Sequence, residues 1–178
     1  MKERLLQYIW QFQYFNKNEL ATANNEPLQV ITAGSLNSNQ GPDFLSAKLK
    51  VSNTIWAGNI EVHINSSDWN IHKHSADSNF NNIILHVVWN HDIEIIDSSG
   101  NNLPTLELQN RVSNLLLDKY RQLMEKAYFI PCENQVYQIS DLTLTNWKQR
   151  LLAERLLSKS KRVLAILTQT NFHWEETF

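Results

Sequence analysis

The sequence predicts an α/β fold in which a mixed sheet is followed by C-terminal helices. Apolar residues recur at helical spacing over residues 3–16, whereas residues 43–51 and 54–64 alternate apolar and polar side chains as strands do. Beyond about residue 110 the spacing becomes helical again. A near-continuous apolar run at residues 82–92 suggests a strand that is buried on both faces of the sheet. The expected order is helix, three strands, short helix, buried strand and further helices.

Turn residues bound these elements. The first helix is apolar over most of its circumference, so we expect it to be largely buried. Residues 27–32 form a short strand that ends in a Gly- and Asn-rich loop, GSLNSNQGP. The turn at residues 52–53 separates the next two strands, which therefore form an antiparallel hairpin. Residues 67–81 are polar and aromatic and indicate a short helix or an ordered loop, and residues 93–108 carry the signals of a second hairpin around SSGN.

The composition indicates a globular protein without a membrane segment. The chain has 178 residues, of which 42% are hydrophobic and 19% are charged, so one ample core is possible. A net charge of −2 and a pI near 6.3 exclude strong indiscriminate binding of polyanions by the chain as a whole. No run approaches the roughly 18 apolar residues of a membrane span. The single cysteine, Cys132, cannot form an internal disulfide, so we expect a reducing, cytoplasmic compartment.

Charge divides the chain into stretches. Residues 31–100 hold seven Asp and Glu but only three lysines, and five of the six histidines lie there. Residues 101–178 carry ten Lys and Arg against eight Asp and Glu. Acids and imidazoles concentrated in one segment are what a metal pocket needs. We therefore expect an α/β core over residues 1–110 that carries the site, and a helical extension over residues 111–178.

The predicted hairpin brings three potential metal ligands together. If the strands pair around the turn at residues 52–53, Asp43 lies across from Glu61 or Val62. Glu61 and His63 are two positions apart on one strand, so their side chains point to the same face. A slip of one residue would send Asp43 to the other face, so the convergence depends on the register. In the alternative interpretation the aspartate caps a turn and the glutamate is a half-buried strand residue with a lysine partner.

The order of these residues resembles the metal-site motif of the PD-(D/E)xK nucleases. The motif appears as PD, ending at Asp43, before one strand and as EVH, from Glu61 to His63, in the next. The resemblance implies that Asp43 and Glu61 bind Mg²⁺ or Mn²⁺, hard ions that prefer oxygen ligands, and that the third residue positions or deprotonates the attacking water. That residue is usually lysine, and His63 stands in its place. The element order also resembles the αβββαβ restriction-endonuclease-like core, over about residues 3–92.

A second group of potential ligands follows the hairpin. It consists of Asp68, His72, His74 and Asp77. If the segment is helical, His74 and Asp77 share a face, whereas His72 and His74 share one only if the segment is extended. These side chains are expected to line the pocket beside Glu61, and Zn²⁺ ligation by the histidines is the alternative to Mg²⁺ or Mn²⁺ at the carboxylates. His86, in the apolar strand, is expected to be a hydrogen-bonded core histidine.

A basic stretch lies in the predicted C-terminal helix. Residues 147–162 carry six Lys and Arg against the single acid Glu154. Such a face could follow the phosphates of a nucleic acid, because neutralising phosphates releases counterions. The candidates for phosphate contact are Lys148, Arg155, Lys159 and Arg162. In the alternative interpretation this is the solvated face of an amphipathic helix whose leucines, at positions 151, 152, 156 and 157, face a core.

Longer runs carry a second resemblance. The chain resembles the bacterial domain-of-unknown-function family 2851 in four runs, which are LQYIWQFQYFN, GPDFLSAKLKV, WAGNIEVHINSSDWNIHKHSADSNFNNIILHVVWNHD and NWKQRLLAERLLSKSKRV. Members of that family are typically longer, so we expect the helical extension to be truncated at its C-terminal end. The family brings no established activity. The functions left open are a divalent-metal-dependent nuclease that hydrolyses phosphodiester bonds, a catalytically inactive nuclease-like module for binding or assembly, and a zinc hydrolase. The sequence also leaves the oligomeric state open.

Overall fold

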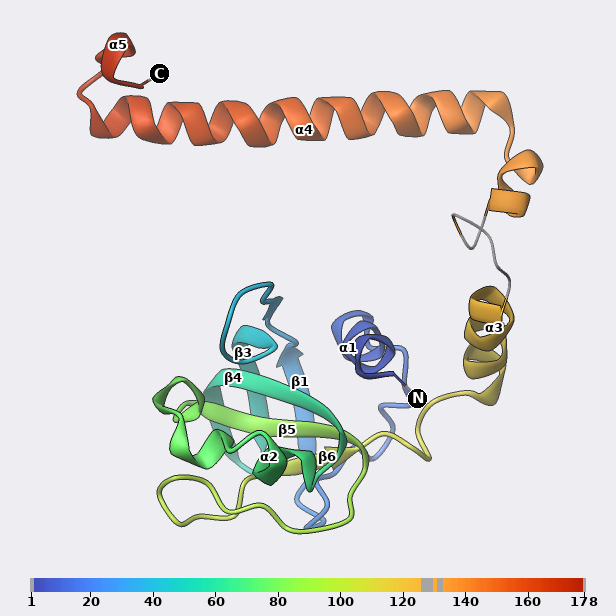
Figure 1. The fold of residues 1–178 in the computed structure, drawn as a ribbon, viewed down its shortest axis with the longest axis vertical. Helices are drawn as coiled ribbons and strands as arrows, with labels where there is room; N and C mark the ends of the chain where they lie inside the picture. Colours follow the sequence, from blue (N-terminus) through green and yellow to red (C-terminus); the bar gives the residue numbers. More distant parts are fainter. Residues whose placement is uncertain (1, 126–129, 131–132, 178) are drawn as a thin grey trace. The chain divides into compact units, whose positions relative to one another are not determined.

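The chain forms two compact units, which are described separately. The computed structural model describes residues 2–125, 130 and 133–177. The first unit covers residues Met1–Lys119 and the second covers Tyr120–Phe178. The fold is mixed α/β, with a mixed sheet followed by helices in the C-terminal part, as the sequence predicts (Figure 1). Cys132 lies outside the described residues.

A curled six-stranded sheet forms the centre of the first unit. Its strands are β1 (Leu28–Thr32), β2 (Ser35–Leu36), β3 (Phe44–Val51), β4 (Thr54–Asn65), β5 (Ile83–Asn90) and β6 (Thr105–Glu107). They lie in the order β1-β3-β4-β5-β6, and β2 pairs separately with β3. The pairs β1–β3 and β3–β4 are antiparallel, whereas β4–β5 and β5–β6 are parallel. The predicted mixed sheet is therefore confirmed.

Helix α1 (Glu3–Phe12) packs against strands β4 and β5. Its buried face consists of Leu5, Leu6, Ile9 and Trp10. Each such side chain contributes roughly 1.5–3 kcal/mol when fully removed from water. The indole of Trp10 also donates to the carbonyl oxygen of Ala33 over 3.0 Å. The helix ends four residues earlier than predicted, because Gln13 adopts a left-handed conformation with φ of 54°. Tyr8 and Phe12 are exposed, so only one face of the helix is buried.

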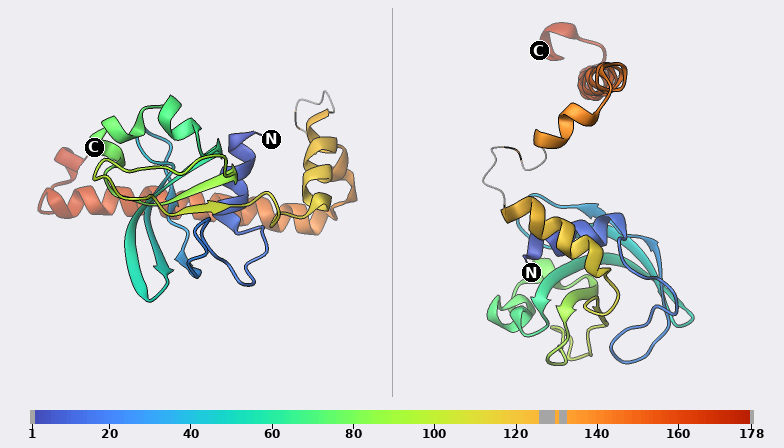
Figure 2. Two further views of the ribbon diagram at one scale, coloured as in Figure 1. Left: turned by 90° about the horizontal axis from the view of Figure 1, so that it is seen from below. Right: turned by 90° about the vertical axis from the view of Figure 1, so that its right-hand side faces the viewer.

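The β3–β4 hairpin has the predicted two-residue turn and, in addition, a bulge. Val51 pairs with Thr54 across the turn, and this end of the hairpin extends beyond β5 and β6, whereas Leu28 of β1 still pairs with Val51 (Figure 2). The bulge lies at Ser46, which has φ of 58° and whose N–H donates to Asn59 Oδ1 over 3.2 Å. Because the bulge adds one residue to β3, Phe44 pairs with Ile60 beyond it. The alternation predicted for residues 43–51 is broken at this point, and Leu45 is exposed.

The segment that follows β4 folds into short helical turns. These are α2 (Asp68–Ile71), η1 (His74–Ala76) and η2 (Ser78–Phe80). Trp69 of α2 is buried with Ile95 and Leu103, and Phe80 packs against this group. Five consecutive residues of β5, from Ile84 to Val88, are buried, which confirms the prediction of a strand covered on both faces. The predicted second hairpin is reduced to one antiparallel bridge, because β6 instead pairs parallel with β5.

The C-terminal part of the chain is helical, as predicted. Helix α3 (Asn114–Glu125) is followed by η3 (Glu133–Gln138), α4 (Asp141–Gln169) and α5 (Trp174–Thr177). Ser140 caps α4, because its hydroxyl accepts from the N–H of Thr143 over 3.3 Å. The four leucines expected to face a core, at positions 151, 152, 156 and 157, are each 43–60% exposed. None of the helices that the structure describes combines the length and the apolar character needed to cross a bilayer.

Candidate metal centre

Asp43 and Glu61 lie side by side at one end of the β3–β4 hairpin. The backbone N–H of Asp43 donates to Glu61 Oε2 over 3.1 Å, and the N–H of Val62 donates to Asp43 Oδ2 over 3.1 Å. Asp43 lies immediately before the paired residue Phe44, and the bulge at Ser46 sets it opposite Glu61. The two carboxylates expected to converge therefore do so.

Glu61 faces two histidines with its other oxygen. Glu61 Oε1 lies 3.6 Å from His63 Nε2 and 3.5 Å from His74 Nε2. Glu61 and His63 are separated by Val62 along β4, so both project from the same face of the sheet. Both residues are buried, with exposed fractions of 6% and 1%. The Glu61 carboxylate therefore links Asp43 to the histidines.

A left-handed turn at Lys73 directs His72 and His74 to one point. Helix α2 ends at Ile71, and Lys73 has φ of 60° before η1 begins at His74. His72 Nδ1 lies 3.0 Å from His63 Nε2, and His74 Nε2 lies 3.4 Å from the same nitrogen. The segment is a short helix followed by short helical turns, consistent with the predicted short helix or ordered loop, and it is neither continuously helical nor extended across His72 and His74. Potential ligand atoms of the three histidines all lie within 4.8 Å of one another.

His86 supports His63 from the neighbouring strand β5. His63 Nδ1 and His86 Nε2 are 2.8 Å apart, and His86 is completely buried. His86 is thus the hydrogen-bonded core histidine that the sequence predicts, and its partner is a residue of the site. Its other nitrogen, Nδ1, has no hydrogen-bond partner among the described residues. The bond to His86 leaves Nε2 as the ring nitrogen that His63 presents to Glu61.

Burial perturbs the titration of several groups at this site, Asp43, Glu61, His63 and His74 among them. Desolvation, with a smaller contribution from the Asp43 charge, raises the pKa of Glu61 from 4.5 to about 9. Desolvation also raises the pKa of Asp43, although the hydrogen bonds that it accepts oppose this rise. Burial, reinforced by neighbouring histidines, lowers the pKa of His63 to about 2 and that of His74 to about 4. A desolvated pair of acids beside neutral imidazoles is an environment that a bound cation would stabilise.

Helix α1 supplies two further residues that were not expected from the sequence. Gln7 Nε2 donates to Asp43 Oδ1 over 2.9 Å. Glu3, one turn earlier, has a raised pKa because of desolvation and then because of the Asp43 charge. The two residues occupy positions i and i+4 and therefore share a helix face. The sequence gives only a weak indication of this role, because Gln7 is simply a polar residue that interrupts an otherwise apolar helix.

The two remaining predicted pocket residues, Asp68 and Asp77, mainly bond to nearby backbone. Asp68 Oδ2 accepts from the N–H of Asn65 over 2.9 Å, and Asp77 Oδ1 accepts from the N–H of Asn79 over 2.9 Å. Short carboxylate side chains commonly satisfy free N–H groups of turns in this way. Asp77 still acts on the site through its charge, which raises the pKa of His74 against the larger, opposing effects of burial and of His72.

The four predicted phosphate contacts lie on α4 in the second unit. They are Lys148, Arg155, Lys159 and Arg162, and all four are exposed. At about 100° per residue, their positions fall within about 60° of one another around the helix axis. Glu154 lies on another side, where its carboxylate pairs with Arg150 over 2.7 Å. The four cations thus lie on one side of the helix. This arrangement agrees both with a phosphate-binding surface and with the solvated face of an amphipathic helix.

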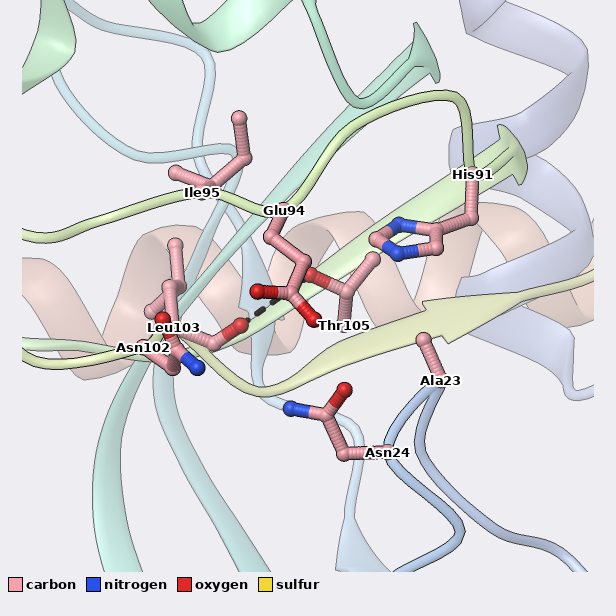
Figure 3. Close-up of a pocket in the computed structure, with 8 residues that line it drawn as sticks. All are labelled: Ala23, Asn24, His91, Glu94, Ile95, Asn102, Leu103 and Thr105. Carbon is pink, nitrogen blue, oxygen red and sulfur yellow. Dashed lines mark hydrogen bonds between the residues drawn. The ribbon is translucent and has the colours of Figure 1, made fainter.

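A small pocket lies elsewhere in the first unit. It is lined by Ala23, Asn24, His91, Glu94, Ile95, Asn102, Leu103 and Thr105, and includes none of the predicted site residues (Figure 3). The His91 ring and the Glu94 carboxylate point toward the same space near Thr105 (Figure 3). The pocket volume is about 10 Å³, which is room for about one water molecule. It is therefore too small to bind a substrate.

The fold and the site together define an α/β protein with a largely buried cluster of carboxylates and histidines. The chain matches the model of the family described as Protein of unknown function (DUF2851) over residues 3–178, and it belongs to that family. No curated protein and no solved structure matches the chain. The family assignment carries no activity with it, so the function has to be argued from the site itself.

Proposed function

We propose that this protein hydrolyses phosphodiester bonds of nucleic acid with a divalent cation, Mg²⁺ or Mn²⁺, held by Asp43 and Glu61. The observation that carries the proposal is the meeting of these two carboxylates at the end of the β3–β4 hairpin, with His63 beside Glu61. Apart from the two-residue strand β2 and the short turns η1 and η2, the element order α1, β1, β3, β4, α2, β5 supports it, because it follows the αβββαβ order of the nucleases that the motif resembles.

The two carboxylates fit a hard cation. Asp43 accepts one hydrogen bond at each oxygen, from Gln7 and from Val62, so each oxygen keeps a lone pair. Carboxylate oxygens are the preferred ligands of Mg²⁺ and Mn²⁺. Both acids have raised pKa values because burial desolvates them. Bound there, a divalent cation would stabilise negative charge at the scissile phosphate and acidify the attacking water.

The surrounding residues orient the two carboxylates. Gln7 holds Oδ1 of Asp43, and the N–H of Asp43 itself holds Oε2 of Glu61. His63 was expected to act as the water-orienting base. It is only 1% exposed, and each of its ring nitrogens lies beside another histidine. We therefore assign His63 to the positioning of Glu61, and His74, which is half-buried and 3.5 Å from Glu61 Oε1, is the more accessible imidazole for contact with water.

Cleavage assays with matched carboxylate variants test this proposal. The full chain is incubated with single- and double-stranded DNA and RNA in the presence of Mg²⁺ or Mn²⁺. We expect cleavage that Asp43→Asn and Glu61→Gln each reduce at least 100-fold, whereas the exposed control Glu19→Gln retains it. Cleavage that survives both site variants would come from a contaminant or another site and would refute the proposal.

A second candidate function, a nuclease-like binding or assembly module without catalysis, has its own supporting observation. The position that is usually lysine is His63, and its two ring nitrogens lie beside His86 and His72 rather than open solvent. The exposed cationic face of α4 could serve binding alone. This candidate predicts nucleic-acid binding that weakens when Lys148, Arg155, Lys159 and Arg162 are changed to Gln, with no metal-dependent cleavage on any substrate.

A further inference from the structure

We infer that His63, His72, His74 and Glu61 together bind one transition-metal ion of the zinc class. The inference goes beyond the proposed function, because it concerns a nitrogen-rich donor set and requires no phosphodiester substrate. The four donor atoms are His63 Nε2, His72 Nδ1, His74 Nε2 and Glu61 Oε1. They come from strand β4 and from the turn between α2 and η1.

Four of the six separations between the donor atoms are close to the edges of a coordination tetrahedron. Zinc binds nitrogen and oxygen ligands at about 2.0–2.1 Å, so tetrahedral geometry places the donors roughly 3.3–3.4 Å apart. His63 Nε2 lies 3.0 Å from His72 Nδ1, 3.4 Å from His74 Nε2 and 3.6 Å from Glu61 Oε1. His74 Nε2 and Glu61 Oε1 are 3.5 Å apart. These four edges lie within about 0.4 Å of the tetrahedral value, and the potential ligand atoms of the three histidines all lie within 4.8 Å of one another.

Hydrogen bonding among the side chains accounts poorly for this convergence. The Nε2 atom of a neutral imidazole carries either one hydrogen or one lone pair, so it can make only one good hydrogen bond. Three polar atoms nevertheless surround His63 Nε2 at 3.0–3.6 Å. A metal ion satisfies all of these donors at once, because each contributes a lone pair to the same centre.

The groups behind the histidines are those expected around metal ligands. A histidine that binds metal through one nitrogen usually donates the other N–H to a fixed acceptor. His63 Nδ1 lies 2.8 Å from His86 Nε2, which directs the Nε2 lone pair of His63 into the cluster. The His74 ring packs against Phe80 and Trp69, with ring centroids 3.8 and 5.1 Å away. The left-handed turn at Lys73 fixes the backbone between His72 and His74.

The donor types select the class of cation. Imidazole nitrogens suit Zn²⁺ and its neighbours among the transition metals, whereas Mg²⁺ and Ca²⁺ favour oxygen. Three imidazoles and one carboxylate are thus poorly matched to Mg²⁺. His72 is exposed, so an ion can reach the cluster from solvent and can keep an open position on that side.

Metal titration of the full chain tests the inference independently of activity. The protein is treated with EDTA, exchanged into chelator-free buffer and titrated with Co²⁺ and Zn²⁺. We expect one equivalent of Co²⁺ to give the visible absorption of a four- or five-coordinate site, and one equivalent of Zn²⁺ to abolish that absorption. His72→Ala should weaken binding at least about tenfold, because loss of even an outer-shell partner of a ligand typically costs about 10–100-fold in affinity. The control His173→Ala should bind as the wild type does.

His72 is exposed, so His72→Ala should stay folded, which circular dichroism verifies, and His74→Gln provides a second ligand loss. Binding of more than one weak equivalent, or binding that neither variant changes, would overturn the inference. Asp43→Asn should leave the cobalt spectrum in place while it removes cleavage. Loss of cleavage and loss of the metal spectrum therefore report separately on the proposed function and on this site.

Discussion

Replacement of Glu61 by glutamine should stabilise the metal-free protein, and the gain should increase with pH. In the wild type, burial raises the pKa of Glu61 from 4.5 to about 9. The folded protein therefore binds a proton that the unfolded chain releases above pH 4.5, so wild-type stability falls as the pH rises from 4.5 towards 9. Glutamine is neutral at every pH and keeps an oxygen that can accept from the N–H of Asp43.

The size of the effect follows from the pKa difference. Each pH unit between the unfolded and folded pKa values changes the free energy of unfolding by about 1.4 kcal/mol. Relative to pH values well below 4.5, ionisation of Glu61 lowers the free energy of unfolding of the wild type by about 3 kcal/mol at pH 7 and by less than about 1 kcal/mol at pH 5. Glu61→Gln should exceed the wild type in stability by similar amounts.

Urea denaturation of EDTA-treated protein between pH 5 and pH 8 measures this difference. The matched control is Glu19→Gln, at an exposed glutamate of the same unit. A difference between Glu61→Gln and the wild type that stays constant across this range would show that Glu61 ionises normally, and the description of a strongly desolvated acid would then be wrong. Addition of Zn²⁺ should reverse the order, because a ligand of the native state stabilises the wild type more.

Three further predictions concern the scaffold. Gly58→Ala should cost about 1–3 kcal/mol of unfolding free energy in urea, because a Cβ would lie 2.6 Å from the carbonyl oxygen of Asn82, and a loss below about 0.5 kcal/mol would contradict this. Gln7→Ala should cost about 2 kcal/mol through the bond to Asp43, while Gln11→Ala, exposed on the same helix, should cost almost nothing. Hydrogen bonds from Ser67 and Ser66 outweigh desolvation and lower the pKa of Asp92 to about 2. A carboxyl NMR titration should therefore find the midpoint of Asp92 near 2, and the stability that these bonds contribute should be lost as the pH falls from about 4 to 2. A midpoint near 3.8 would contradict this assignment.

The β3–β4 hairpin shows how far sequence patterns reach. Alternation and a two-residue turn were sufficient to pair Val51 with Thr54, because both signals are local. They also brought Asp43 to within one position of Glu61. The final choice of partner depends on the bulge at Ser46, and a serine with positive φ has no distinctive sequence signal. The general location of the acid pair was therefore predictable, and its precise register was not.

The histidine cluster was less accessible from the sequence. Its geometry depends on the left-handed conformation of Lys73, a lysine that no turn motif identifies. The contribution of Gln7 depends on the packing of α1 against the sheet, which joins residues 36 positions apart. Contacts of this kind arise from tertiary packing, so propensity and periodicity do not reveal them.

The bulge at Ser46 has a consequence for how this chain can vary in length. Two residues of β3, Leu45 and Ser46, oppose the single residue Asn59. A deletion of Ser46 would therefore restore one-to-one pairing while Phe44 stayed opposite Ile60 and Asp43 stayed opposite Glu61. The strand would become straighter and shorter by one residue, yet the acidic pair would not move. Relatives with one residue fewer at this position could thus keep the same arrangement of acids.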